Sequence, residues 1–154
     1  MNRLVVISIL LFSISISAQR NPFKNLVEKD GKIGIGTSTP DELLTVKGKI
    51  HTQEVRVDLD GAVAPDYVFE SYYQGFSKAM PEYYLISLEE LEAYLKENRH
   101  LPNIPSAETM EQQGFSLKEM NLLLLQKIEE LTLYTLDQQK QIDALKKTVQ
   151  NLNK

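Results

Sequence analysis

Residues 116–154 have the sequence SLKEMNLLLLQKIEELTLYTLDQQKQIDALKKTVQNLNK, which contains neither glycine nor proline. No residue in this stretch would therefore break a helix in its interior. Ser116, followed three residues later by Glu119, forms a capping-box pattern in which each side chain accepts a hydrogen bond from an amide that the first turn leaves free. The sequence predicts one long helix that begins at Ser116 and runs to the end of the chain.

Apolar residues recur along this helix in a heptad pattern. The a positions are Asn121, Ile128, Thr135, Ile142 and Val149, and the d positions are Leu117, Leu124, Leu131, Gln138, Leu145 and Leu152. These eleven positions are called the seam below, and eight of them are apolar. A seam sustained over five heptads predicts a coiled coil between identical chains. The apolar members expected to make the contact are Leu117, Leu124, Ile128, Leu131, Ile142, Leu145, Val149 and Leu152. A lone amphipathic helix folded back on its own domain is the alternative.

The apolar surface of the helix changes along its length. Up to Leu136 it spreads beyond the seam to several further leucines and a tyrosine, and beyond Asp137 it narrows to the seam alone. A wide apolar surface needs a cover besides an identical helix. We therefore expect the preceding short helices and the aromatic segment to pack on the first part, and only symmetry mates to bury the second.

Residues 58–115 form an acidic region with an aromatic segment at its start. Seven of the twelve aromatic residues of the chain lie between Tyr67 and Tyr84. Aromatic rings supply much of the core of a small domain, but they also bind sugars and partner proteins. We expect core packing for most of them, and a partner-binding face is the alternative, with Tyr72, Tyr73 and Phe76 as its candidate residues.

Two short helices are expected within the same region. Ser87 and Glu90 form a capping box, and Pro102 prevents a helix from continuing, so the first helix should end near Asn98. Ser106 should cap a second short helix that ends near Gln113. Gly114 is suited to end that helix because glycine adopts the left-handed conformation at little cost.

Residues 31–57 carry strand and turn signals. Gly31-Lys32-Ile33-Gly34-Ile35-Gly36-Thr37 is followed by a turn at Ser38–Asp41 and by Leu44, Val46, Gly48 and Ile50 at period two. The glycines would permit close backbone approach in a narrow stalk of wrapped chains. A phosphate-binding loop is disfavoured because the glycine spacing does not fit a strand-to-helix turn. Residues 19–30 are expected to be a linker.

The first eighteen residues resemble a secretory signal peptide. Arg3 precedes an uncharged apolar run from Leu4 to Ile16, and cleavage is expected after Ala18. Cleavage after Ser17 and an uncleaved N-terminal anchor are the alternatives. A run of thirteen residues is too short to span a bilayer, so no stable membrane span is expected after cleavage. The sequence predicts export to the cell surface or the medium, without disulfides because the chain has no cysteine.

We find no pattern for catalysis or for cofactor, metal or nucleic acid binding. The chain has two histidines, too few for a multi-histidine zinc site, and a net charge of -4 without a basic patch. His100 is expected near a helix end, where the helix dipole favours a positive charge. Ser87, Ser106 and Ser116 are explained as helix caps, so no serine is assigned as a nucleophile. The sequence therefore predicts a protein that is not an enzyme.

Several motifs resemble the C-terminal module of tail-fibre-like and adhesin-like secreted bacterial proteins. They are Gly34-Ile35-Gly36-Thr37 with Pro40, Pro65-Asp66-Tyr67-Val68-Phe69-Glu70, Leu88-Glu89-Glu90, Lys96-Glu97-Asn98, His100-Leu101-Pro102, Ile104-Pro105-Ser106-Ala107 and the run from Leu124 to Tyr134. The resemblance covers roughly residues 31–134 and implies a short β-rich stalk closed by a helical tip. Here the stalk repeat occurs once, and Ala64 stands where relatives often have tryptophan.

The expected fold class is α+β: a short glycine-containing β-rich stalk, small helices and a long C-terminal coiled-coil helix. Isoleucine at a with leucine at d favours two helices, whereas the resemblance implies a trimer. The predicted function is a non-catalytic oligomerisation module of an exported fibre-like protein. Two alternatives stay open: a surface protein that binds a glycan or a protein, and a self-cleaving chaperone of the tail-fibre type.

Overall fold

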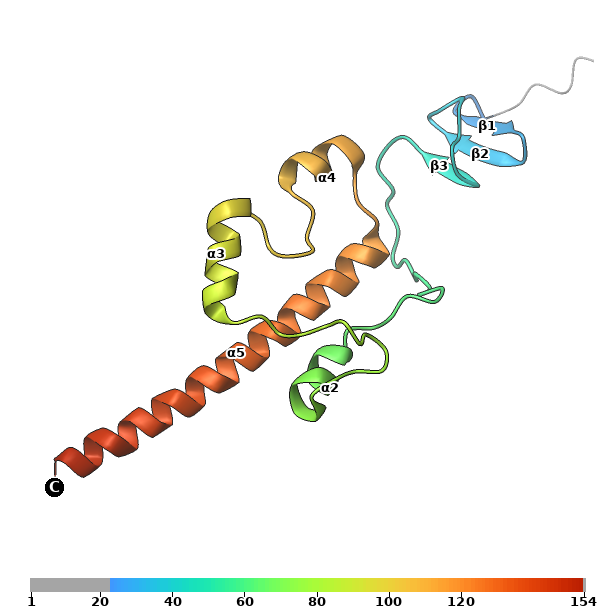
Figure 1. Ribbon diagram of the computed structural model, residues 1–154. Coiled ribbons are helices and arrows are strands. Elements are labelled where there is room, and N and C mark those ends of the chain that lie inside the picture. The colour runs from blue at the N-terminus through green and yellow to red at the C-terminus, as the bar shows by residue number, and fades with distance from the viewer. Residues whose placement is uncertain (1–22, 154) are drawn as a thin grey trace, which may run out of the picture. The chain divides into compact units, whose positions relative to one another are not determined.

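The computed structural model describes residues 23–153, and the expected α+β fold class is confirmed within them (Figure 1). A three-stranded sheet precedes four helices in the part of the chain that is described. The chain divides into two compact units, of which one ends at Val55 and the other begins at Arg56. The predicted signal peptide, residues 1–18, lies outside the described residues.

A tight hairpin opens the first unit. Strand β1 (Leu26–Lys29) pairs antiparallel with β2 (Lys32–Ile35), and the connecting Asp30 and Gly31 both have positive φ, 52° and 77°. Asp-Gly is a preferred pair for a two-residue turn of this kind. The expectation of a linker over residues 19–30 is therefore wrong for Leu26–Lys29, which form a strand because this turn returns the chain onto them.

Strand β3 (Leu44–Val46) pairs parallel with β2 and completes the sheet, in the order β1-β2-β3. Thr45 closes the preceding loop, because its hydroxyl donates to the Asp41 carboxylate at 2.7 Å and accepts from the Asp41 amide at 3.1 Å. The predicted strand is wrong beyond Val46, since Gly48 and Ile50 lie outside any strand. Strand β2 ends at Ile35, so Gly48 and Ile50 have no residue of β2 beside them with which to pair.

Two glycines of the first unit permit close approach within one chain. A Cβ on Gly34 would lie 2.5 Å from the carbonyl oxygen of Thr37, and one on Gly36 would lie 2.9 Å from that of Lys47. Gly36 also has a φ of 74°, which side-chain-bearing residues rarely adopt. The sequence predicted glycines for approach between chains, whereas these two are needed by the fold of a single chain.

The aromatic segment begins with a helix that the sequence analysis did not identify. Helix α2 (Tyr67–Gln74) follows Pro65 and ends at Gly75, which has a φ of 87° and donates to the Ser71 carbonyl. A glycine directly after the last helical residue is a usual signal of a helix end. Four of the eight residues of α2 are aromatic, which gives the segment low helix propensity and obscures this signal.

The two short helices form where the sequence predicted them. Helix α3 (Leu88–Asn98) has the full capping box between Ser87 and Glu90. Helix α4 (Ala107–Gln113) is capped by Ser106 and ends at Gly114, whose φ is 70°. Neither helix contains a buried residue. Both therefore depend on local capping more than on core packing.

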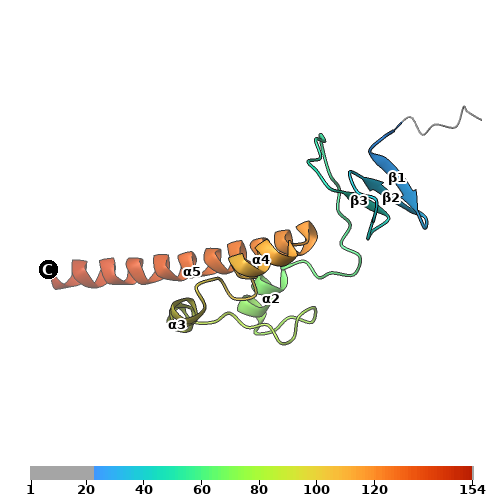
Figure 2. The same ribbon diagram turned by 90° about the horizontal axis from the view of Figure 1, so that it is seen from above.

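Helix α5 (Leu117–Leu152) is the predicted long helix, and the Ser116 hydroxyl accepts from the Glu119 amide at its start. The small core lies where α2 packs on it, and its fully or nearly buried apolar residues are Tyr67, Val68 and Leu133. Figures 1 and 2 both show the C-terminal part of α5 extending beyond α2, α3 and α4. The expected aromatic cover on the first part of α5 is confirmed, whereas α3 and α4, which were also expected to cover it, contribute no residue to this core.

Candidate functional site

The α2 side of α5 is called the covered face and is defined by the buried residues Gln126, Glu129 and Leu133. Spacings of three and four residues place them on one side of the helix. Val68 of α2 and Leu133 are both fully buried, and Tyr72, Met80 and Tyr83 pack around them. The first part of α5 is thus held against its own chain.

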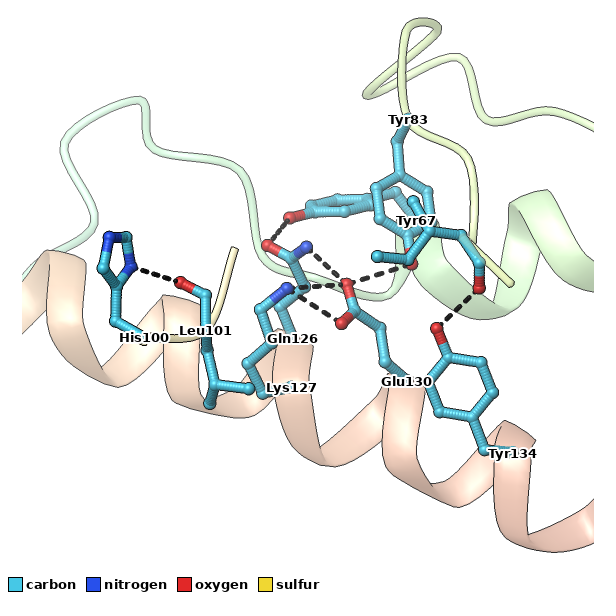
Figure 3. Close-up of polar contacts among 9 residues, drawn as sticks. Tyr67, Tyr83, His100, Leu101, Gln126, Lys127, Glu130 and Tyr134 are labelled. Carbon is cyan, nitrogen blue, oxygen red and sulfur yellow. Dashed lines mark hydrogen bonds and ion pairs between the residues drawn. The ribbon is translucent and has the colours of Figure 1, made fainter. Parts of the chain in front are cut away.

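Polar groups connect this face to the aromatic segment (Figure 3). The Tyr67 hydroxyl donates to Gln126 Oε1 at 2.9 Å, and Gln126 Nε2 donates to Glu130 Oε1 at 2.7 Å. Glu130 also accepts from the Tyr83 hydroxyl at 3.2 Å and from Lys127 Nζ at 2.8 Å. Glu130 is therefore the centre of a network in which a single carboxylate accepts from three side chains.

Two further tyrosines extend the contact along α5. The Tyr134 hydroxyl donates to the Ile86 carbonyl at 2.7 Å, and the Tyr72 hydroxyl donates to Asp137 Oδ1 at 2.6 Å. The bonded helix positions, from Gln126 to Asp137, span about three turns. Directional bonds over that length fix the rotation of α5 about its own axis, and so decide which face points away from the chain.

The electrostatics keep the tyrosine hydroxyls in the donor form. Burial, with the charge of Glu130 as the next cause, raises the pKa of Tyr83 well above its usual range. The same two causes raise the pKa of Tyr134 to about 12. Burial and Glu130 also raise the pKa of Tyr67. All three hydroxyls stay protonated near neutral pH and can donate to their acceptors.

Glu129 is the exception in this otherwise paired face. Its side chain is 5% exposed, and its Oε2 atom is buried without a hydrogen-bond partner. Burial, followed by the charge of Asp66, raises the pKa of Glu129. An unpaired buried carboxylate costs stability when it is ionised. Asp137 has the opposite perturbation, because its bond from Tyr72 lowers its pKa.

The seam lies on the opposite side of α5 from the covered face. Leu124 and Ile142 each lie nine residues from Leu133, which at ~3.6 residues per turn is about two and a half turns. The apolar seam residues are 45–80% exposed, with Ile142 the lowest and Leu152 the highest. From Gln138 to Asn153 every residue is exposed. The chain therefore leaves all eight predicted association residues uncovered.

The predicted partner-binding residues are separated by the fold. Tyr72 is half-buried and bonded to Asp137, whereas Tyr73 and Phe76 are 67% and 56% exposed. The Tyr73 ring meets Tyr72 edge-on, with 4.9 Å between ring centroids. Two of the three candidates therefore remain accessible to a partner, and the third has a structural role.

The other chemical candidates lie in structural positions. Ser87, Ser106 and Ser116 each accept a hydrogen bond from the amide three residues later and act as helix caps. His100 follows the end of α3, and its Nδ1 lies 3.0 Å from the Leu101 carbonyl oxygen. Within residues 23–153, no three histidine, aspartate or glutamate side chains are grouped to hold a metal ion.

The sequence analysis missed the polar contacts of the covered face. Their signal is the presence of Gln126, Glu130 and Asp137 in a region that is otherwise rich in leucine. Comparison of this chain with protein-family profiles, with curated proteins and with solved structures finds no match. In the described part of the chain, no helix has the length and apolarity needed to cross a bilayer.

Proposed function

We propose that this protein is an exported, non-catalytic assembly module that associates with identical chains through the seam of α5. The observation that carries the proposal is the exposure of the apolar seam on the face opposite the tyrosine contacts. Had α5 folded back on its own domain through the seam, those residues would be covered. The alternative of a lone folded-back helix is therefore disfavoured for the seam face.

The C-terminal part of α5 adds an energetic argument. Residues beyond Asp137 are all exposed, although Lys140 is bonded to the Tyr72 hydroxyl, and isolated helices of about this length are marginal in water. Burial of Ile142, Leu145, Val149 and Leu152 would contribute roughly 1.5–3 kcal/mol each. Association of identical helices is the simplest way to bury these four side chains while keeping the helix straight.

A trimer in a fibre-like surface structure is the form that we favour. It rests on the resemblance of the motifs between Gly31 and Tyr134 to the tips of tail-fibre-like proteins, and on the signal-like first eighteen residues. The sheet also offers apolar surface: Ile33 and Leu44 are register partners, so they share a face, and they are 41% and 58% exposed. Association of α5 would bring such sheets from separate chains together and reduce the entropy cost of pairing them.

The test is the mass of the protein from Gln19 to Lys154 in solution, measured by light scattering after size exclusion. We expect a trimer. The double variant Ile142→Asp with Leu145→Asp should dissociate it, because two charges would enter the seam. Ala144→Asp with Gln150→Asp is the matched control, since it adds the same charge to exposed positions outside the seam. A monomeric wild type, or equal masses for the two double variants, would refute the proposal.

A second candidate function is binding of a glycan or protein by the exposed Tyr73 and Phe76. Exposed aromatic rings of this kind stack on sugars or enter partner pockets. Tyr73→Ala with Phe76→Ala should abolish binding on a glycan array without changing the oligomeric mass. Tyr72→Ala is a poorer test because Tyr72 also holds Asp137. Binding that is unchanged in the double variant would exclude this patch.

A further inference from the structure

A pocket of about 520 Å³ opens on one flank of α5, between the covered face and the seam. The helix contributes Leu123, Gln126, Lys127 and Glu130 to its lining. The rest of the wall comes from earlier in the same unit, namely from Tyr67 of α2, from the segment between Met80 and Ile86, and from Pro102 and Asn103. Figure 3 shows the polar part of this wall, with Lys127 and Glu130 turned toward each other.

The polar groups that α5 contributes to the pocket are already paired. Glu130 accepts from Lys127, Gln126 and Tyr83, and the Lys127 and Glu130 side chains are each only 13% exposed. The apolar part of the wall is made of Met80, Ile86, Pro102 and Leu123 with the ring of Tyr84, and Glu82 and Asn103 also line the pocket. A pocket of this composition fits an apolar side chain better than a charged ligand.

The position of the pocket relative to the seam indicates where such a side chain would come from. Lys127 directly precedes the seam residue Ile128 and occupies a g position, while Leu125 directly follows Leu124 and occupies an e position. These rows flank the seam on opposite sides. In a parallel coiled coil the g row of one helix faces the e row of its neighbour. The pocket flank of one chain would then face Leu125 of the next.

Leu125 is unusual among the e positions of α5. It is apolar and 42% exposed, whereas the other e positions are Lys118, Thr132, Gln139 and Lys146. Its Cα lies only two residues from that of Lys127, or about 3 Å along the helix axis, so an in-register neighbour presents it at the level of the pocket. Leu125 of one helix and the pocket of the neighbouring chain would therefore lie at the same level along the coiled coil, on flanks that face each other.

We propose that a second copy of this chain completes the pocket, with Leu125 of the neighbouring helix packed between Leu123, Ile86 and the Tyr84 ring. The proposal rests on the association proposed above and deepens it, because it specifies parallel, in-register helices and a contact from the e position beside the seam of one chain to the folded aromatic segment of the next. Around a closed ring each chain supplies one pocket and one leucine.

Cross-linking tests this contact cleanly because the chain has no cysteine. One chain carries Tyr84→Cys and the other Leu125→Cys, and the two are co-expressed and treated with a short bis-maleimide. We expect a cross-linked pair containing one chain of each kind, in severalfold higher yield than from either variant alone. Absence of that mixed product would overturn the proposal, provided that the bundle itself forms.

Formation of the bundle is tested separately with Ile128→Cys, because a seam residue of one parallel helix lies next to the same residue of its neighbour. Cross-linked Ile128→Cys chains without the mixed product would refute the pocket contact and leave the proposed association standing. Failure of both would refute the proposed association as well. If either single variant alone gave as much cross-linked product as the mixture, the proposed contact between the pocket and Leu125 would also be refuted.

A substitution pair gives an independent measure. Leu125→Ser should raise the dissociation constant of the assembly by about tenfold or more, because a leucine that is buried only in the assembly is lost. Leu136→Ser is the control: Leu136 is similarly exposed, 45% against 42%, but lies beyond the level of the pocket. Equal effects of the two substitutions would contradict the proposal.

Discussion

The two parts of α5 differ in what surrounds them. Between Leu117 and Asp137 the helix has a covered face bound to tyrosines and an exposed seam, whereas between Gln138 and Leu152 all of its side chains are exposed. The first part can fold within a single chain because α2 supplies apolar cover. The second part has no such cover, and in the proposed assembly identical chains would supply it. The face that packs within the chain is therefore opposite the face that we propose for association.

The largest expected difference in stability is between alanine substitutions at Leu133 and at Leu131, two leucines that lie two residues apart. Leu133→Ala should lower the free energy of unfolding by about 3 kcal/mol because Leu133 is fully buried. Leu131→Ala should change it little in a dissociated background, since Leu131 is 63% exposed. Urea unfolding of both variants, made on the Ile142→Asp and Leu145→Asp chain, measures the difference. Equal losses would contradict the division of α5 into two faces.

A smaller effect is expected from the network around Glu130. Tyr83→Phe removes a donor to Glu130 and leaves the ring in place, so it should cost about 1 kcal/mol of unfolding free energy. Tyr84→Phe is the matched control because Tyr84 is 65% exposed. Thermal unfolding followed by tyrosine absorbance would show whether only the first variant loses stability.

The smallest effect concerns Glu129 and is seen as a dependence on pH. Burial raises the folded-state pKa of Glu129 above its ordinary value of 4.5, so stability from the protonated form is present below that value and is lost as pH rises through the folded-state pKa. Glu129→Gln should therefore be more stable than the wild type at neutral pH and lose this part of the pH dependence.

The measurement is the stability difference between Glu129→Gln and the wild type at several pH values from 4 upward, at intervals of about one unit. The exposed Glu111→Gln is the control. A difference that stays constant with pH, or an equal change in the control, would show that ionisation of Glu129 does not affect folding.

Local sequence signals predicted the elements that depend on local contacts. The ends of α3 and α4 and the start of α5 follow from serine caps, whose partner amides lie only three residues away. The hairpin at Asp30-Gly31 has an equally local signal, the Asp-Gly pair itself, which the linker prediction did not use. Helix α2 was not expected, because its aromatic residues have low helix propensity and are held in place by packing on α5.

The sequence by itself determined that α5 is one long helix and that its seam follows a heptad, because capping, the absence of breakers and periodicity are properties of neighbouring residues. Which apolar face of α5 the chain covers was decided only by the tertiary structure. Leu131 and Leu133 are the same residue type two positions apart, yet one is exposed and the other buried. The reason is non-local: tyrosines 47 to 65 residues away in the sequence bond to one side of α5, and the heptad pattern contains no information about those partners.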